Sequence, residues 1–398
     1  MARPKQDRPE PQLREYRLRA HLTQEEVAAT IGANAELVRK HERGLARPTE
    51  HYRKRYCELY KADEVQLGLR APERVSTEAE EVVDVLARIR RLETSRIGAD
   101  MLLGLGLAVE DIIDRYERVG PAQLIRPLTD QRKVLDGLID DCRSCAQRQQ
   151  LLRLAGQTSA LLGYLAVNRE RYPLARAYCA EAIHLADYAE DPELLAWIKG
   201  TQSFCEYYAG DFRRAVDFAR EGLTLAGDGP QSVRLAINGE ARALGKLGDI
   251  AGVHAAVERA YTLTDRLPEI PGVSPCISLG GYSLARTASN ADTAYVDLGI
   301  PEQVARHAEI AMPEFEASES QWSQSLIRLD LANSMAAAQD SDPEEASDLV
   351  GQALNISADK PITSVIQRSR AFVRATGKWR GVRAVDEVHQ AVAAARLR

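Results

Sequence analysis

The sequence predicts an all-α protein with two parts, a small helical domain at the N-terminus and a long array of helical hairpins after it. Apolar residues recur at three- and four-residue spacing along almost the whole chain, and alternating β-like runs are rare. A chain of 398 residues exceeds what one hydrophobic core usually covers. From about residue 150 a helical pattern also repeats at similar intervals. These three observations predict the fold class and the two-part organisation.

Charge divides the chain in the same way. Residues 1–70 carry 15 Lys and Arg against 11 Asp and Glu, whereas the remainder carries 37 against 47. The N-terminal part is basic and the body is acidic. This distribution indicates that only the N-terminal part binds a polyanion, because the negative charge of the body repels polyanions.

Composition argues against several other classes. No apolar run approaches the roughly 18 residues that a membrane span needs. The start "MARPKQDRPEPQ" lacks the apolar core of a signal peptide, so residues 1–11 are interpreted as a disordered basic arm. Cys142 and Cys145 form a C-x-x-C without a second pair. We interpret the six cysteines as thiols of a cytoplasmic protein, with zinc or redox use of the pair as the alternative.

The sequence contains none of the common catalytic signatures. The seven histidines form no zinc-protease pattern, and no phosphate loop or G-x-S-x-G elbow occurs. We therefore expect no enzyme, no metal and no cofactor.

The first domain contains two short helices joined by a tight turn. Thr23 and Glu26 have the spacing of a capping box, which predicts a helix beginning there. Gly32 suits the turn, since glycine adopts a positive φ without steric cost. Asn34 then caps a second helix that ends at Gly44. Further helices are expected in "PQLREYRLRAHL" before this pair and "HYRKRYCELYKADEVQLGL" after it.

The domain boundary is predicted near "GLRAPERVSTEAEE", where Pro72 ends the first helical region. We assign residues 12–70 to the first domain, residues 71–77 to a linker and residues 78–398 to the body. Residues 78–148 are expected to form helical hairpins with weak signatures.

The repeat in the body is defined by small residues at +4 and +11 from five helix starts. The starts are separated by 40, 38, 51 and 42 residues, and the longest interval holds the insertion "RLPEIPGVSPCISLGG". The five starting residues are Arg171, Asp211, Asp249, Ile300 and Asp342. Small residues seven apart lie on one helix face and allow a neighbouring helix to approach closely, so stacked hairpins are expected to build the core.

The repeat resembles the tetratricopeptide repeat, most closely in "YYAGDFRRA" and in the Leu162–Gly163 pair, although its periods exceed the standard 34 residues. The resemblance implies a right-handed α-solenoid with the leading helix of each hairpin on a concave face. Such a face binds an extended peptide or a partner helix. The residues expected to line this groove are Tyr164, Asn168, Trp197, Phe204, Tyr208, Asn238, Arg242, Lys246, Arg286, Asn290 and Arg328.

The first domain resembles the helix-turn-helix of the Xre/lambda-repressor-like family. The match rests on Arg17, Thr23–Glu25, Ala28, Gly32, Val38, Glu42–Gly44 and Arg47–Pro48. It implies a five-helix domain over residues 12–70 that binds double-stranded DNA, with Arg17 and Glu42 bracing the first helix against the third. The residues then expected to face bases are Asn34, Ala35, Glu36 and Arg39. Those expected to hold phosphates are Gln24, Lys40, Arg43, Arg47, Arg53 and Arg55.

Two side chains of this domain permit two interpretations. Glu36 gains stability from the helix N-terminus, or it accepts a hydrogen bond from cytosine N4 and selects that base. His41 is a packed core residue or a pH sensor.

A helix-turn-helix followed by such repeats resembles the RRNPP peptide-sensing regulators. The resemblance implies a sequence-specific DNA-binding transcription regulator that forms a homodimer through its body. It also implies that the body senses a short signalling peptide or other small ligand, as in quorum sensing. The alternative is a constitutive regulator whose repeat domain only dimerises or recruits a protein partner.

Overall fold

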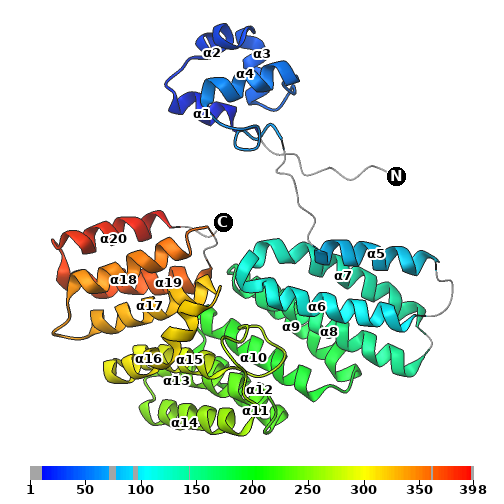
Figure 1. Cartoon of the computed structure of the whole chain (residues 1–398), viewed down its shortest axis with the longest axis vertical. Coiled ribbons are helices and arrows are strands. Elements are labelled where there is room, and N and C mark those ends of the chain that lie inside the picture. Colours follow the sequence, from blue (N-terminus) through cyan, green and yellow to red (C-terminus); the bar gives the residue numbers. More distant parts are fainter. Residues whose placement is uncertain (1–10, 71–77, 93–96, 143, 360–361, 396–398) are drawn as a thin grey trace. The chain divides into compact units, whose positions relative to one another are not determined.

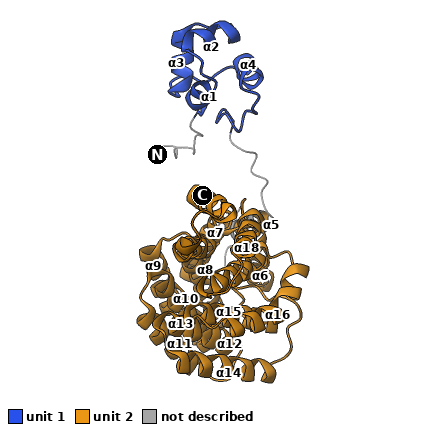
Figure 2. Ribbon diagram, turned by 90° about the vertical axis from the view of Figure 1, so that its left-hand side faces the viewer, with its two compact units in different colours: residues 1–76 blue, residues 77–398 orange. Residues whose placement is uncertain are grey.

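The structure is a computed structural model that describes residues 11–70, 78–92, 97–142, 144–359 and 362–395. The predicted linker 71–77 and all of the predicted basic arm except Pro11 lie outside the described residues. The chain divides into two compact units, residues 1–76 and 77–398 (Figure 2). The described residues contain helices and no strand, which confirms the all-α fold class.

Four helices form the described part of the first unit, which we call the head. They are α1 (Leu13–Arg19), α2 (Gln24–Ile31), α3 (Ala35–Glu42) and α4 (Glu50–Tyr60). The fifth helix implied by the family resemblance is absent from this part of the chain, where residues 64–69 form turns and a bend. The Asp63 side chain accepts hydrogen bonds from the amides of Val65 and Gln66, and Gly68 follows with φ 65°. A cap and a left-handed glycine this close together leave room for a single turn.

The core of the head is formed by one apolar side chain from almost every segment. Leu13, Val27, Val38, Tyr56 and Leu67 are each fully buried. The two helices of the predicted pair are capped as the sequence indicates. Thr23 and Glu26 form a complete capping box, Gly32 is left-handed with φ 74°, and Asn34 Oδ1 accepts the amide of Leu37 at 2.8 Å.

The second unit, which we call the body, is a stack of antiparallel helices (Figure 1). Its first helices are α5 (Glu78–Leu92), α6 (Ala99–Val119), α7 (Pro121–Asp141), α8 (Cys145–Val167), α9 (Tyr172–Tyr188), α10 (Pro192–Ala209) and α11 (Phe212–Ala226). A segmented helix follows as α12 (Gln231–Arg234), a π-helical stretch (Leu235–Ala241) and α13 (Arg242–Leu247). The last helices are α14 (Ile250–Arg266), α15 (Leu284–Leu298), α16 (Pro301–Ala317), α17 (Gln321–Ala337), α18 (Pro343–Ile356), α19 (Thr363–Ala375), a 3₁₀ turn (Thr376–Trp379) and α20 (Arg383–Ala394).

All five helix starts predicted from the repeat are confirmed as N-cap residues, of α9, α11, α14, α16 and α18. Each of these helices packs against the helix or segmented helix before it, as α8 with α9 and α10 with α11 (Figure 1). The small residues face the partner helix. Ala175 and Ala182 of α9 are fully buried, for example. At Gly245 of α13 a β-carbon would lie only 2.5 Å from the carbonyl oxygen of Ala294, so α13 and α15 pack with almost no space between their backbones.

The Pro- and Gly-rich insertion between α14 and α15 packs back onto α10 and α12. Trp197 Nε1 donates to the carbonyl of Ser278 at 2.8 Å, and Gln231 donates to the carbonyls of Leu279 and Gly280. The early and late helices of the body also meet. α6 contacts α17, and Thr363 donates to the carbonyl of Asn168 at 2.9 Å. These contacts narrow the inner face that sequence reasoning expected to be an open groove.

Candidate DNA-binding face and an internal polar cavity

Most of the residues predicted to line a groove surround one small cavity inside the body. Its volume is about 60 Å³. The predicted residues in its lining are Tyr164, Asn168, Phe204, Tyr208, Asn238, Arg242, Arg286 and Asn290. The leading helices therefore direct these side chains inward together, around a small, partly open cavity rather than along an open groove.

Three predicted groove residues lie outside the lining. Trp197 is fully buried in the core, under the guanidinium of Arg234 at 4.6 Å from the ring centroid. Lys246 pairs with Asp297 at 2.6 Å. Arg328 pairs with Glu316 at 2.8 Å. Each side chain has a close partner within the body, and its part in ligand binding stays a prediction.

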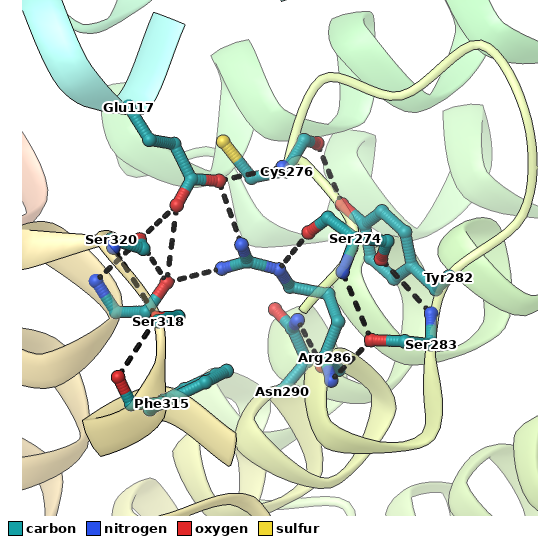
Figure 3. Close-up of polar contacts among 11 residues, drawn as sticks. Glu117, Ser274, Cys276, Tyr282, Ser283, Arg286, Asn290, Phe315, Ser318 and Ser320 are labelled. Carbon is teal, nitrogen blue, oxygen red and sulfur yellow. Dashed lines mark hydrogen bonds and ion pairs between the residues drawn. The ribbon is translucent and has the colours of Figure 1, made fainter. Parts of the chain in front are cut away.

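Arg286 was expected to line the groove, and its guanidinium meets the carboxylate of Glu117 on α6. Its Nη2 donates to Glu117 Oε1 at 2.7 Å, its Nη1 to Ser323 Oγ at 2.7 Å, and its Nε to the carbonyl of Ser274 at 2.9 Å (Figure 3). Glu117 also accepts the amide of Cys276 at 2.9 Å and the hydroxyl of Ser320. The pair thus joins α6, α15, the insertion and the start of α17 at one buried point.

The environment of Glu117 favours its ionised form. Burial raises the pKa of this carboxyl, but Arg286 and the donated hydrogen bonds more than offset burial and leave the pKa below its ordinary value. Arg368, another lining residue, pairs with Asp330 at 2.7 Å. Beside them, burial and the neighbouring Asp330 raise the pKa of Asp292 well above its ordinary value.

In the head, one buried ion pair joins α1 to α3. Arg17 donates to Glu42 through Nε at 2.6 Å and Nη2 at 3.2 Å, and its Nη1 donates to the carbonyl of Leu22. The predicted brace between the first and third helices is therefore present. Gln24 also donates to Glu42, at 2.7 Å, so its amide is engaged within the head rather than free for phosphate.

The exposed face of α3 carries the residues predicted to read bases. Asn34 and Glu36 are exposed, while Ala35 and Arg39 are half-buried. Arg39 Nη1 pairs with Glu36 Oε2 at 2.6 Å, and Lys40 lies 3.9 Å from the same carboxylate. One side of the helix therefore presents an amide, a carboxylate and two cations in solvent.

Comparison with known proteins identifies the head. A family model described as a helix-turn-helix domain matches residues 12–68. The head is a helix-turn-helix domain. No curated protein matches the sequence. The crystal structure of Bacillus thuringiensis PlcR in complex with the peptide PapR7 and DNA aligns with 94% of this chain and 100% of that chain, at 10% identity and a TM-score of 0.29. Such a low score is too weak to relate the two architectures.

Four other arginines predicted to hold phosphates differ in whether they form ion pairs within the domain. Arg43 and Arg47 are exposed. Arg53 lies 3.4 Å from Glu64 and Arg55 lies 4.0 Å from Glu58. Surface ion pairs contribute about 0–1 kcal/mol, so Arg53 and Arg55 can exchange these carboxylates for phosphates.

His41 is a packed core residue of the domain. It is almost fully buried, and its Nδ1 lies 3.2 Å from the hydroxyl of Tyr56. Burial lowers its pKa, which keeps the ring neutral at physiological pH. The structure therefore favours the interpretation of His41 as a packed core residue over that of a pH sensor.

Sequence reasoning missed five important lining residues of the cavity. They are Tyr116, Glu117, Cys276, Trp322 and Arg368. Glu117 and Arg368 lie outside the five repeat units used to assign inward positions, and Cys276 lies in the insertion. A polar residue within the apolar stripe of α6 was the available signal for Glu117.

Within the described residues no group of three or more His, Cys, Asp or Glu side chains is arranged to hold a metal ion. No helix in that part of the chain has the length and apolar character to cross a bilayer.

Proposed function

We propose that this protein is a sequence-specific transcription regulator that binds double-stranded DNA through α3 and acts as a homodimer. The observation that carries the proposal is the exposed face of α3 on a braced helix-turn-helix domain. In this class of domain the second helix of the pair enters the major groove with its N-terminal residues on base edges. Asn34, Glu36 and Arg39 occupy that end of α3.

The ion pair between Glu36 and Arg39 is compatible with base reading. Both side chains are about half exposed, so the pair contributes little in water and exchanges readily for contacts with DNA. An arginine suits guanine O6 and N7, and a carboxylate suits cytosine N4. In the free protein, the two side chains lie 2.6 Å apart on the exposed side of α3.

We propose dimerisation because the head is small. One helix-turn-helix domain makes a small interface with DNA, and proteins of this kind gain affinity by placing two copies about one helical turn apart. The body is the larger unit and is the proposed dimer surface.

We further propose that the body senses a ligand. Its inner face holds a polar cavity with buried charged side chains, which a purely structural repeat array does not need. A cavity of about 60 Å³ has no room for an extended peptide, so peptide binding would require the insertion and the late helices to move away. A small molecule fits without that rearrangement. The alternative remains a regulator whose body only dimerises or recruits a protein.

The DNA-binding proposal is tested by selecting duplexes from a random pool with the full chain and measuring affinity for the selected site. Arg39→Ala should lower specific affinity by about 1–3 kcal/mol and relax preference at one base pair. Arg19→Ala on α1 is a matched control, since Arg19 is also exposed and pairs with a nearby glutamate. A wild-type chain that enriches no sequence would overturn sequence-specific binding.

A further inference from the structure

Among the described residues, three arginines but only one carboxylate line the cavity of the body. The cations are Arg242, Arg286 and Arg368, and the carboxylate is Glu117. Arg286 is neutralised by Glu117 and Arg368 by Asp330, each at 2.7 Å. Among the described residues no carboxylate lies within 4.0 Å of the guanidinium of Arg242. Within the described part of the chain, Arg242 is therefore the lining arginine that has no directly paired carboxylate.

Arg242 is deeply buried, with 4% of its surface exposed. Its Nη2 donates to the hydroxyl of Tyr208 at 3.0 Å and its Nη1 reaches Asn290 Oδ1 at 3.5 Å. Its guanidinium carbon lies 4.5 Å from the centroid of the Tyr207 ring. The Nε atom is buried and has no hydrogen-bond partner.

Neutral phenols and amides orient a guanidinium but do not cancel its charge. A buried cation without an anionic partner is costly, and proteins normally pair such groups. The field in the cavity acts on Tyr208 as well. Burial raises the pKa of this phenol, but Arg242 and Arg368 more than offset burial and leave the pKa below its ordinary value. The cavity therefore favours negative charge at this position.

The backbone next to Arg242 is also unusual. Leu235–Ala241 forms a π-helical stretch that ends directly before Arg242. Such stretches are rare and occur frequently at functional sites. Asn238 lies in this stretch and donates to Asn290 at 2.9 Å, which places two amides beside the guanidinium.

From this geometry we propose that the cavity binds a small organic monocarboxylate, with Arg242 as its counter-ion and Asn238 and Asn290 as amide contacts. The volume corresponds to roughly four water molecules, which suits an anion with only a few non-hydrogen atoms. Aromatic and aliphatic side chains, including Phe204, Trp322 and Ile362, also line the cavity and can cover a short apolar chain. One uncompensated cation calls for one negative charge, which favours a monocarboxylate over a dicarboxylate or phosphate.

This inference deepens the proposed ligand sensing by naming a ligand class, but its test does not require DNA. The full chain is titrated with sodium acetate, propionate, butyrate, hexanoate and phosphate, at pH 7 and constant ionic strength, by calorimetry and thermal unfolding. We expect saturable binding and a rise in Tm for the short carboxylates, with an optimum at a chain length below hexanoate. Equal or stronger stabilisation by phosphate, or no saturable binding by any carboxylate, would overturn the proposal.

The decisive variant is Arg242→Met, which removes the charge and keeps an unbranched side chain. We expect at least a hundredfold loss of carboxylate affinity, with a ligand-free Tm equal to or above that of the wild type because an unpaired charge is removed. Arg213→Met on the exposed face of α11 is the matched control and should retain binding. Arg242→Lys, which keeps the charge, should retain measurable binding if Arg242→Met does not fold.

The main rival is that an ionised Tyr208 supplies the missing negative charge. Absorbance at 295 nm distinguishes the two, since a tyrosinate in the wild type at pH 7 that is lost in Tyr208→Phe would overturn the proposal. Carboxylate binding that persists in Tyr208→Phe supports it. The effect on operator affinity is measured separately, so a failure of the DNA proposal leaves the binding result intact.

Discussion

Glu117 on α6 and Arg286 on α15 form a buried ion pair across 169 residues of sequence, with 2.7 Å between Oε1 and Nη2. The pair joins the early helices of the body to its later hairpins and anchors the insertion through the amide of Cys276. Contacts of this kind leave only a small cavity on the inner face of a chain whose pattern is that of an open array. Substitution of this pair therefore tests what holds the body together.

Breaking the Glu117–Arg286 pair should strongly destabilise the body. Glu117→Gln keeps the shape of the side chain but leaves Arg286 buried without a counter-charge, which costs about 3–5 kcal/mol. Urea unfolding of the full chain, followed by far-UV circular dichroism, measures the change. Glu319→Gln is the control, because its side chain is 83% exposed and should change stability by less than about 1 kcal/mol. Equal effects of the two substitutions would contradict the assigned role of Glu117.

Stability should fall as the pH falls from about 6.5 towards 4, in part because of His307. This ring is buried against Tyr261, with 2.8 Å between Nδ1 and the hydroxyl, and burial lowers its pKa to about 4. The unfolded chain binds a proton at this residue below about pH 6.5 while the folded chain does not, so acidification favours unfolding in that window.

His307 contributes at most about 1.4 kcal/mol of unfolding free energy per pH unit within this window. His307→Gln removes the titrating ring and should flatten the dependence by that amount, whatever its effect on stability at neutral pH. Urea unfolding of both chains at several pH values between 4 and 7 measures the two slopes. A variant with the slope of the wild type would show that other groups cause the dependence.

Glu36→Gln separates the two interpretations of Glu36. If the carboxylate accepts a hydrogen bond from cytosine N4, the substitution should reduce discrimination against thymine at one position by about 1–3 kcal/mol. If Glu36 only stabilises the N-terminus of α3, the base preference should stay the same and stability should fall by about 0.3–1 kcal/mol. Competition binding with single-base variants of the selected site measures the first, and thermal unfolding of the full chain the second.

Residues 77–398 should fold and dimerise without the head. This unit has its own hydrophobic clusters, and the helix-turn-helix domain has a separate one. Analytical ultracentrifugation of the isolated unit measures its association, and a gel shift should find no DNA binding. A folded but monomeric product would place the dimer contact in the head instead.

Local signals in the sequence were sufficient for most of the helical framework. Thr23, Gly32 and Asn34 define the helix pair of the head because caps and turns depend on a few neighbouring residues. The five repeat starts were found as N-caps for the same reason. The predicted fifth helix of the head was wrong because a capping Asp63 and a left-handed Gly68 leave only one turn between them.

The inner face of the body was predicted only in part from local sequence signals. Helical periodicity predicted that Tyr164, Phe204, Arg242 and Asn290 point to the same side of the stack, and these side chains do line one cavity. Periodicity carried no information about what covers that side. The cover depends on the insertion and on Glu117, whose partner lies 169 residues away.

The sequence by itself therefore determined the helices, their pairing into hairpins and the helix-turn-helix domain, because these depend on spacing and caps within about forty residues of chain. Only the tertiary structure decided which charges are paired. Arg286 meets Glu117 and Arg368 meets Asp330, while Arg242 has no carboxylate partner in the described part of the chain. Ion pairs form between side chains within a few ångströms in space, and that proximity is set by how the whole stack closes rather than by any local pattern.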